Sequence, residues 1–189
     1  MGYAKYLSEL WTKPKENFGT ERWRAWLMSL RREPAIVRLE KPTRLDKARL
    51  LGYKAIQGIF IVRSRVPKGG RKRPKPGHGR RPKRYGRFIE TRKSKQLIAE
   101  QRAARKFPNA EVINSYWVGE DGKYAWYEVI MADRAQASKH PSFAWLANPA
   151  NKRRVYRGLT SAGKKSRGLR KKGPSATKFR PSKRSKGTK

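Results

Sequence analysis

The chain has 189 residues, of which 50 are Lys or Arg and 13 are Asp or Glu, so its formal net charge is +37. A chain with this charge repels itself, and the simplest partner that offsets the repulsion is a polyanion such as nucleic acid. It has no cysteine, which excludes disulfides and thiolate metal sites. No apolar run approaches the roughly 18 residues of a membrane span. We therefore expect a soluble intracellular protein, with one modest core because only 36% of its residues are hydrophobic.

Apolar side chains at spacings of three and four residues predict two helices in the first 34 residues. The first helix covers residues 2–13 and ends before Pro14. The second begins near Thr20, whose hydroxyl can cap free amide groups, and ends before Pro34. Three tryptophans lie in this region. They could be platforms on which nucleic-acid bases stack, but their helical spacing favours packing in the core.

The next segment predicts a strand, a short helix and a longer strand. The β-branched run Ile36–Leu39 is typical of a strand. Thr43 and Asp46 have the spacing of a capping box, which predicts a helix that ends before Gly52, a natural C-cap. Residues 56–66 predict one long strand, whose second half alternates between arginines and small or apolar side chains. We expect the far end of this strand to leave the body of the protein.

Residues 67–87 are the most basic stretch of the chain: ten of these 21 residues are Lys or Arg, five are Gly and four are Pro. Ordering each residue costs about 1 to 2 kcal/mol of backbone entropy, and this stretch has no aliphatic side chain whose burial could offset that cost. We therefore expect a long basic loop that leaves the body and becomes ordered only on a polyanion.

Residues 111–133 predict a β-hairpin, because two β-rich runs flank Asp121-Gly122, a dipeptide that favours tight hairpin turns. If Glu120-Asp121 formed the turn instead, Val118 would oppose Lys123. The first turn is favoured because it predicts aromatic and opposite-charge cross-strand pairs. These pairs are Glu120 with Lys123, Trp117 with Trp126, and Tyr116 with Tyr127.

A helix separates the basic stretch from the hairpin: Thr91 can cap it, and it continues to about Lys106. The whole order of elements predicts an α/β (α+β) fold with a small, four-stranded, mostly antiparallel sheet, packed helices and N-terminal helices. We expect residues 1–156 to form a single body that carries the basic excursion.

The C-terminal part of the chain has no acidic residue: the 56 residues after Asp133 contain 18 Lys or Arg. Asn148 and Pro149 can start a last short helix, with Asn as its cap and Pro at its first position. Residues 157–189 show no hydrophobic periodicity. We expect them to form an extended basic tail that becomes ordered on RNA.

No motif in the chain supports catalysis. The segment Gly158–Lys165 nearly matches the phosphate-binding loop of nucleotide hydrolases, but Lys165 stands where Mg²⁺ coordination requires a hydroxyl. Neither His78 nor His140 has the partners of a metal site or a catalytic triad. The carboxylates around the hairpin are explained by turn formation and salt bridging. We expect no enzyme activity, no cofactor and no metal site.

Pro42–Pro74, Asn114–Asp133 and Arg157–Leu169 are three stretches that carry a resemblance to a known family. They resemble the archaeal and eukaryotic type of large ribosomal subunit protein fifteen, which is unrelated to its bacterial namesake, and the run Tyr3–Trp11 is similar to the start of that family. The resemblance implies a structural protein of the cytoplasmic ribosome, with an α/β body at the subunit surface and extensions that enter ribosomal RNA. Its implied partners are large-subunit ribosomal RNA and neighbouring ribosomal proteins, with one copy per ribosome and no membrane or small-molecule substrate.

The cations of the basic regions are the residues that we expect to contact RNA, because Lys and Arg that neutralise phosphates release condensed counterions. By matching positions, the resemblance implies Lys54, Arg63, Arg65, Lys68, Arg71, Lys72, Arg73, Arg157, Lys164, Lys165, Arg167 and Arg170. Composition alone adds Lys75, Arg80, Arg81, Lys83 and Arg84.

Two other functions remain open on the sequence. A DNA-binding architectural protein would have the same excess of positive charge. An RNA-modifying enzyme would show turnover and would be present at less than one copy per subunit.

Overall fold

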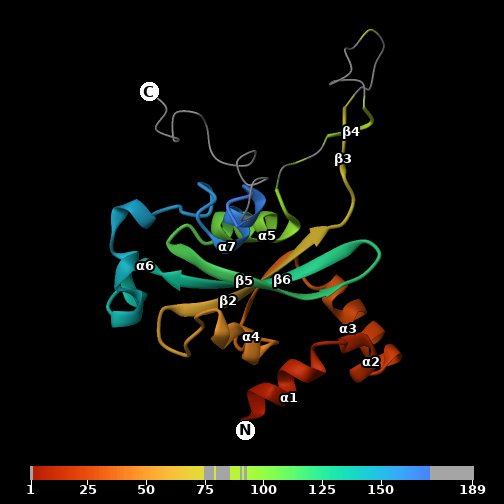
Figure 1. Cartoon of the computed structure of the whole chain (residues 1–189), viewed down its shortest axis with the longest axis horizontal. Helices are drawn as coiled ribbons and strands as arrows, with labels where there is room; N and C mark the ends of the chain where they lie inside the picture. The colour runs from red at the N-terminus through yellow and green to blue at the C-terminus, as the bar shows by residue number, and fades with distance from the viewer. Residues whose placement is uncertain (1, 75–78, 80–85, 90, 92, 171–189) are drawn as a thin grey trace.

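A four-stranded antiparallel sheet with the strand order β1-β2-β6-β5 forms the centre of the protein (Figure 1). The computed structural model describes residues 2–74, 79, 86–89, 91 and 93–170. The sheet consists of β1 (Ile36–Leu39), β2 (Ile59–Pro67), β5 (Ala110–Glu120) and β6 (Tyr124–Asp133). This architecture confirms the predicted α+β fold with a small antiparallel sheet.

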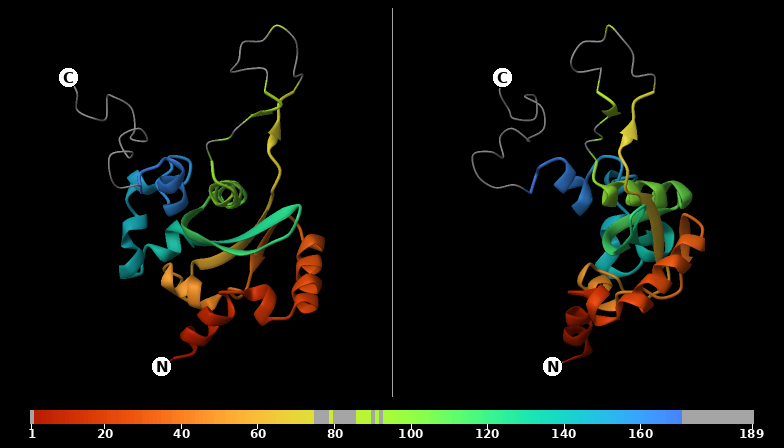
Figure 2. Two further views of the ribbon diagram at one scale, coloured as in Figure 1. Left: turned by 45° about the vertical axis from the view of Figure 1, so that its right-hand side comes forward. Right: turned by 90° about the vertical axis from the view of Figure 1, so that its right-hand side faces the viewer.

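Helices cover both faces of the sheet (Figure 2). One face carries α1 (Tyr3–Leu10), α2 (Pro14–Asn17), α3 (Thr20–Arg32) and α4 (Leu45–Leu50). The other face carries α5 (Lys95–Lys106) and α7 (Ser161–Ser166). After β6 come the short segments α6 (Arg134–Ala137), η1 (Pro141–Leu146) and η2 (Pro149–Asn151). None of the helices in the described part of the chain has the length and apolar character that a membrane span requires.

Each face of the sheet has its own hydrophobic core. In β2, Ile61 packs in a cluster with Leu27 of α3, whereas the next residue, Val62, packs in a cluster with Leu97 of α5. Because side chains alternate along a strand, a strand that is covered on both faces must be apolar at successive positions. This explains the continuous apolar run in the predicted strand, which begins at Ile59 in the structure rather than at residue 56.

The N-terminal tryptophans belong to the core. Trp11 and Trp23 are each 8% exposed, and their ring centroids lie 6.0 Å apart. Trp26 is half-buried beside Trp23. The prediction of core packing is therefore confirmed for Trp11 and Trp23. In the same predicted helix, Tyr3 and Tyr6 are 49% and 62% exposed. This helix therefore contributes to the hydrophobic core mainly through its C-terminal end, where Trp11 lies.

The predicted capping box at the start of α4 is wrong. The N-cap residue is Arg44, and its side chain makes no capping hydrogen bond. Thr43 instead turns toward β6, where its backbone N–H and its hydroxyl both donate to the buried carboxylate of Glu128. Asp46 lies 3.7 Å from the Arg44 guanidinium. A tertiary contact to a charged acceptor thus replaces the local cap.

Two other predicted caps also differ from the structure. Helix α3 begins at Thr20 itself, so its N-cap is Gly19, which has no side chain to contribute. Helix α5 begins later than expected, and Ser94 rather than Thr91 caps it by accepting a hydrogen bond from the Leu97 N–H at 3.2 Å. The predicted cap of the last short helix is correct, because the Asn148 side chain accepts from the second residue after it at the start of η2.

The hairpin between β5 and β6 has neither of the two predicted registers. Its two turn residues are Gly122 and Lys123, because the Asp121 N–H donates to the Tyr124 carbonyl at 2.9 Å. The Asp121 carboxylate then accepts from the N–H groups of Lys123 and Tyr124, both at 2.6 Å. These hydrogen bonds from the backbone to the Asp121 side chain place the chain reversal at Gly122-Lys123, one residue after the predicted Asp121-Gly122.

A β-bulge near the end of β5 shifts the pairing again, between Trp117 and Gly119. The observed pairs are Trp117 with Tyr127, Gly119 with Trp126, and Glu120 with Ala125. A Cβ on Gly119 would lie 3.2 Å from Leu27 of α3, so this glycine lets the helix pack directly on the strand. Helix packing on the sheet, rather than the aromatic pairs, accounts for the register.

Candidate nucleic-acid interface

The basic stretch begins as a direct continuation of β2. Beyond the sheet, β3 (Arg71–Lys72) pairs with β4 (Phe88–Ile89) as a separate two-stranded ribbon. We call residues 68–89 the basic arm, of which 68–74, 79 and 86–89 are described. The arm projects from the body on the same side of the sheet as α5 and α7 (Figures 1 and 2). The prediction that β2 leads out of the body is confirmed.

The base of the arm is held by contacts with the hairpin and with α5. The Lys68 N–H donates to the Lys123 carbonyl at 2.8 Å, and the Lys68 ammonium lies 3.2 Å from the Glu120 carboxylate. Just before it, Arg65 places its guanidinium over the Tyr124 ring, 4.8 Å from the centroid. The Arg102 guanidinium of α5 donates to the Arg65 carbonyl at 3.0 Å. These contacts fix the direction in which the arm leaves the sheet.

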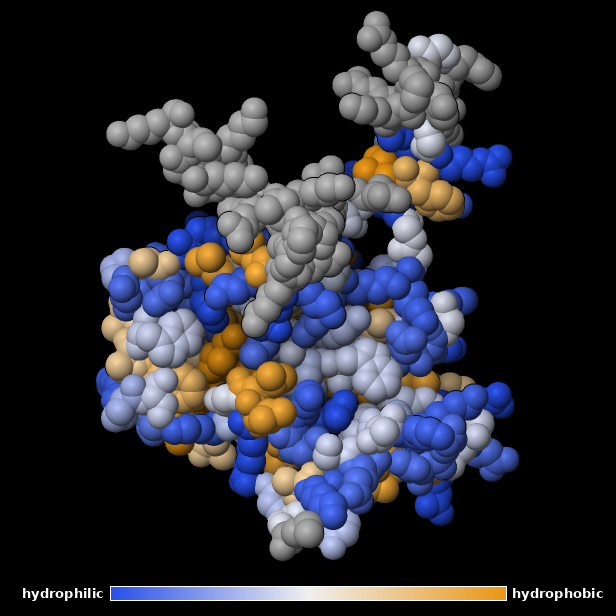
Figure 3. Space-filling model, in the orientation of Figure 1, coloured by the Kyte–Doolittle hydropathy of each residue, from blue (hydrophilic) through white to orange (hydrophobic). Residues whose placement is uncertain are grey.

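Cations on the arm face solvent. Arg71 and Lys72 are exposed, and within the described residues their side chains make no hydrogen bond or ion pair. The Arg73 N–H and guanidinium instead donate across the ribbon to the carbonyls of Arg87 and Gly86, at 2.9 and 3.0 Å. Hydrophilic and hydrophobic residues lie side by side on the described part of the arm (Figure 3), and the ring-bearing Phe88 is 58% exposed.

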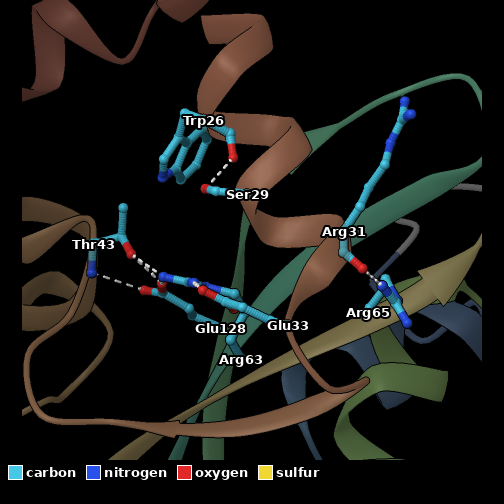
Figure 4. A network of polar contacts seen from close by, with 8 residues as sticks. All are labelled: Trp26, Ser29, Arg31, Glu33, Thr43, Arg63, Arg65 and Glu128. Carbon is cyan, nitrogen blue, oxygen red and sulfur yellow. Dashed lines mark hydrogen bonds and ion pairs between the residues drawn. The ribbon is translucent and has the colours of Figure 1, made fainter. Parts of the chain in front are cut away.

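Arg63, a predicted phosphate contact, lies inside the protein. Its side chain is 10% exposed, and it donates to both oxygens of the Glu33 carboxylate at 3.0 and 2.9 Å (Figure 4). It also donates to the Thr43 hydroxyl at 2.9 Å and reaches Glu128 at 3.4 Å. Its charge is therefore already balanced by two carboxylates.

Glu128 is the fully buried centre of this network. Besides Arg63 and Thr43, it accepts a hydrogen bond from the Tyr116 hydroxyl at 2.6 Å. Burial and the neighbouring Glu128 carboxylate raise the pKa of Tyr116, so its hydroxyl stays protonated and donates. The alternation of β2 correctly puts Arg63 and Arg65 on one face, but that face packs against the N-terminal layer.

Two other predicted contacts also have partners within the chain. Arg65 is half-buried, and its guanidinium donates to the Arg31 carbonyl at the end of α3. Lys54 is exposed in the loop between α4 and β2, where its ammonium donates to the Ser142 hydroxyl of η1 at 2.6 Å. Neither residue lies on the arm.

Residues 157–170 pack on the body, although they were expected to belong to a tail that orders only on a partner. Thr160 is buried, and its hydroxyl donates to the Glu100 carboxylate at 2.6 Å while accepting the Gly163 N–H at 3.2 Å. The Ser115 hydroxyl donates to the other Glu100 oxygen at 2.5 Å. Burial raises the pKa of Glu100, against the effect of these two hydrogen bonds. The packed body therefore includes α7, whose last residue, Ser166, donates from its hydroxyl to the Ser94 hydroxyl at 3.2 Å.

The glycine pattern that resembles a phosphate-binding loop has a packing role here. A Cβ on Gly163 would lie 2.6 Å from the Gly158 Cα and 2.7 Å from its carbonyl carbon. Gly158 itself has a φ of 65°, in the left-handed region that favours glycine. The backbone of α7 thus crosses the preceding turn at a distance that only glycine permits.

We expect Gly163→Ala to separate α7 from the turn before it, because the added methyl group would meet backbone atoms that cannot move independently. Hydrogen exchange of residues 157–170 should become faster in this variant, while the exchange of β2 and β6 stays slow. Ser161→Ala, in the same helix, is the matched control and should leave exchange unchanged. Unaltered protection of the segment in Gly163→Ala would contradict this role.

The cations of the C-terminal segment form a second exposed group, which we call the α7 surface: Lys164, Lys165, Arg167 and Arg170. The side chains of Lys164, Lys165 and Arg170 make no hydrogen bond or ion pair among the described residues. Arg167 donates to the Arg157 and Gly158 carbonyls at 3.4 and 3.3 Å, and Arg157 donates to the carbonyls of Ala150 and Lys152. The remaining predicted contacts, Lys75, Arg80, Arg81, Lys83 and Arg84, lie outside the described residues.

The carboxylates around the hairpin are used in structural contacts, as expected from the sequence. Glu120 pairs with Lys68, and Asp121 pairs with Arg31 at 2.5 Å. Although partial burial opposes ionisation, hydrogen bonds from the turn amides and from Arg31 lower the pKa of Asp121. Nδ1 of His140 accepts the Ser142 N–H at 3.2 Å as the cap of η1. Within the described residues, no group of three or more His, Asp or Glu side chains could hold a metal ion.

Sequence reasoning did not single out several exposed residues near these surfaces. Phe88 lies among the arm cations, and Arg105, Lys152 and Arg153 gather around one pocket beside α5. The Lys-Arg-Arg triplet at 152–154 within the acid-free part of the chain is the signal that could have indicated this cluster.

A basic α+β body that presents unpaired cations on a projecting arm and on a C-terminal segment is typical of a nucleic-acid-binding protein. Comparison with protein families agrees: the family described as Ribosomal L15, of the L15e type, matches residues 2–186. The chain therefore belongs to this family of the large ribosomal subunit. It is a structural constituent of the ribosome in the cytoplasm and acts in translation.

Proposed function

We propose that the chain binds large-subunit ribosomal RNA through the basic arm and the α7 surface, and stabilises the packing of RNA helices that meet there. The observation that carries this proposal is that both surfaces hold exposed cations whose side chains have no partner among the described residues: Arg71 and Lys72 on the arm, and Lys164, Lys165 and Arg170 on the α7 surface. Both surfaces project from the α5 side of the sheet (Figures 1 and 2).

The physics of phosphate neutralisation supports these residues over the other predicted contacts. A cation that already has a carboxylate partner gains little from a phosphate, whereas a solvated cation releases condensed counterions from the RNA. Arg63 is therefore excluded from the proposed interface. Lys54 and Arg65 donate to neutral oxygens of the chain, contacts that an RNA phosphate would have to replace, so they contribute less than the arm. The exposed ring of Phe88 adds a surface on which an unpaired base can stack.

The proposal includes one copy of the chain per subunit, with neighbouring ribosomal proteins as further contacts. Association with large subunits that survives DNase but not RNase would separate it from a DNA-binding architectural protein. One copy per subunit without turnover would separate it from an RNA-modifying enzyme.

The salt dependence of binding to large-subunit ribosomal RNA tests the arm directly. In the double variant Arg71→Ala and Lys72→Ala, the slope of log affinity against log salt should become shallower by about 1.5, because two phosphate contacts are lost. The control removes the same charge from exposed positions of α3 with Arg24→Ala and Arg32→Ala, and its slope should equal that of the unmodified chain. Equal slopes in the arm variant and the unmodified chain would contradict the proposal.

A further inference from the structure

A concave pocket of about 680 Å³ lies between the C-terminal end of α5 and the turn after η2. This volume is within the range of roughly 300 to 1,000 Å³ that small-ligand sites occupy. Its lining combines cations with apolar groups: Arg105, Lys152, Arg153 and Arg157 stand against one carboxylate, Glu111, and the apolar lining includes Val155 and Tyr156. A pocket that combines cations with a flat apolar surface suits a nucleotide, because the cations can bind its phosphate and the apolar surface can contact its base.

Three of the pocket cations are available for a ligand. Arg105, Lys152 and Arg153 are exposed, and their side chains make no hydrogen bond or ion pair among the described residues. The single carboxylate of the pocket, Glu111, does not neutralise these three side chains. It is 4% exposed, and one of its oxygens already accepts the Arg153 backbone N–H at 2.6 Å. The mouth of the pocket is therefore positive.

Arg153 is held in an unusual backbone conformation. Its φ is 55°, in the left-handed region that favours glycine, and it is the only non-glycine residue with a positive φ in the described part of the chain. Besides Glu111, its neighbour Arg154 holds this turn, because the Arg154 guanidinium donates to the carbonyls of Val112 and Ile113 at 2.9 and 3.2 Å. Strained positions of this kind gather at ligand sites, where the surrounding fold imposes them.

The apolar part of the pocket is suited to a planar group. Val155 is fully buried beneath it, and Tyr156 is 46% exposed. The Tyr156 hydroxyl donates to the Gln101 carbonyl of α5 at 3.3 Å, which restricts the orientation of the ring. An aromatic ring with restricted orientation is a good platform for a base, because little rotamer entropy is lost on stacking.

We propose that this pocket binds one extruded nucleotide of RNA, with its base against Tyr156 and its phosphates near Arg105, Lys152 and Arg153. The inference rests on the proposed function in taking RNA as ligand, but it assigns a site apart from the basic arm and the α7 surface. An intact duplex cannot use the pocket fully, since its bases are stacked inside the helix, whereas a loop or bulge can present a single base. An acidic peptide would use the cations but leave the aromatic and apolar lining without a role.

The test compares the affinity of the full chain for a short single-stranded oligouridine with its affinity for an RNA duplex that carries the same number of phosphates. Arg153→Gly is the central variant, because glycine keeps the left-handed backbone while the guanidinium is removed. Arg105→Ala removes a second cation from a position where alanine favours the helix. Tyr156→Ala removes the ring and no charge.

Each variant should weaken single-strand binding by about tenfold, from the loss of a charged contact or of a stacked base, and duplex binding by less than about twofold. Arg24→Ala on α3 removes the same charge far from the pocket and should change neither affinity by more than about twofold. The melting temperature of Arg153→Gly should stay close to that of the unmodified chain. A thiouridine-substituted oligonucleotide should form its photochemical crosslink within residues 152–157.

If all three variants lost affinity for the oligouridine and for the duplex by the same factor, the proposal would be overturned. The pocket would then be a phosphate-binding surface without a site for a base. The proposal would also be overturned, in favour of an acidic peptide as ligand, if polyglutamate displaced the oligouridine and bound the Tyr156→Ala variant with the same affinity as the unmodified chain. If the arm variant kept its full affinity and salt slope on ribosomal RNA while the pocket variants behaved as expected, the proposed role of the arm would fail and the pocket would stand.

Discussion

Deletion of Lys68–Arg84 is expected to abolish stable incorporation of the chain into large subunits while the body still unfolds cooperatively. The deletion removes nine Lys or Arg, and none of the residues of this segment that the structure describes, 68–74 and 79, belongs to either hydrophobic cluster. The loss therefore falls on phosphate contacts, each of which contributes about 0.7 to 0.9 to the salt slope, and not on apolar burial. Sedimentation with large subunits measures incorporation, and a thermal melt measures the folding of the body.

A second variant separates charge from chain length in this experiment. Replacing the nine Lys and Arg with Ser and Gln keeps the length of the arm and should block incorporation as the deletion does. Loss of the cooperative melt in the deletion would mean that the arm contributes to the core. Normal incorporation of the neutral variant would mean that its shape, not its charge, is recognised.

Glu128→Ala is expected to cost about 3 to 5 kcal/mol of unfolding free energy, because it leaves the buried guanidinium of Arg63 with one carboxylate instead of two. The same change leaves the Tyr116 hydroxyl and the Thr43 N–H without their acceptor. For a domain of ordinary stability, about 5 to 15 kcal/mol, this is a large part of the total. Denaturant unfolding followed by tryptophan fluorescence measures it.

The pair offers its own control. Replacing both residues, with Arg63→Met and Glu128→Met, removes the two buried charges together and should recover part of the stability that Glu128→Ala loses, although the Tyr116 hydroxyl and the Thr43 N–H still lack their acceptor. Glu128→Gln should lie between the two, since it keeps one acceptor oxygen. A loss below about 1 kcal/mol in Glu128→Ala would show that water or another group already satisfies Arg63.

Local sequence patterns predicted the elements of this fold better than their registers. The β-branched run at Ile36–Leu39 forms β1 with the expected ends, and the apolar run of β2 reflects a strand covered on both faces. The hairpin register could not be predicted, because the bulge at Gly119 accommodates Leu27, a residue far away in the sequence. The predicted capping box failed for the same reason, because Thr43 bonds to a buried carboxylate 85 residues away instead of capping its own helix.

The predicted RNA contacts show the same limit. Alternation along β2 placed Arg63 and Arg65 on one face, but only the tertiary structure brings Glu33 and Glu128 to Arg63, from 30 and 65 residues away. Residues 157–170 were likewise predicted to belong to a tail, because they are rich in Gly and Ser. The buried hydrogen bond from Thr160 to Glu100 joins residues 60 positions apart, so composition could not predict it. The exposure of cations such as Arg71 and Lys72 was predictable, because no residue in the described part of the chain pairs with their side chains.

The attachment of the arm and of α7 to one sheet, through Arg102 of α5 on one side and Glu100 on the other, has a consequence for affinity. Once one of the two surfaces is bound to RNA, the other is held close to the phosphates that it would contact. Its effective concentration at those phosphates is then set by the separation of the two surfaces in the fold. The combined affinity can then exceed that of either surface, but only for RNA whose two segments have the matching separation. A protein without base-specific contacts at either surface would in this way select a tertiary arrangement of RNA.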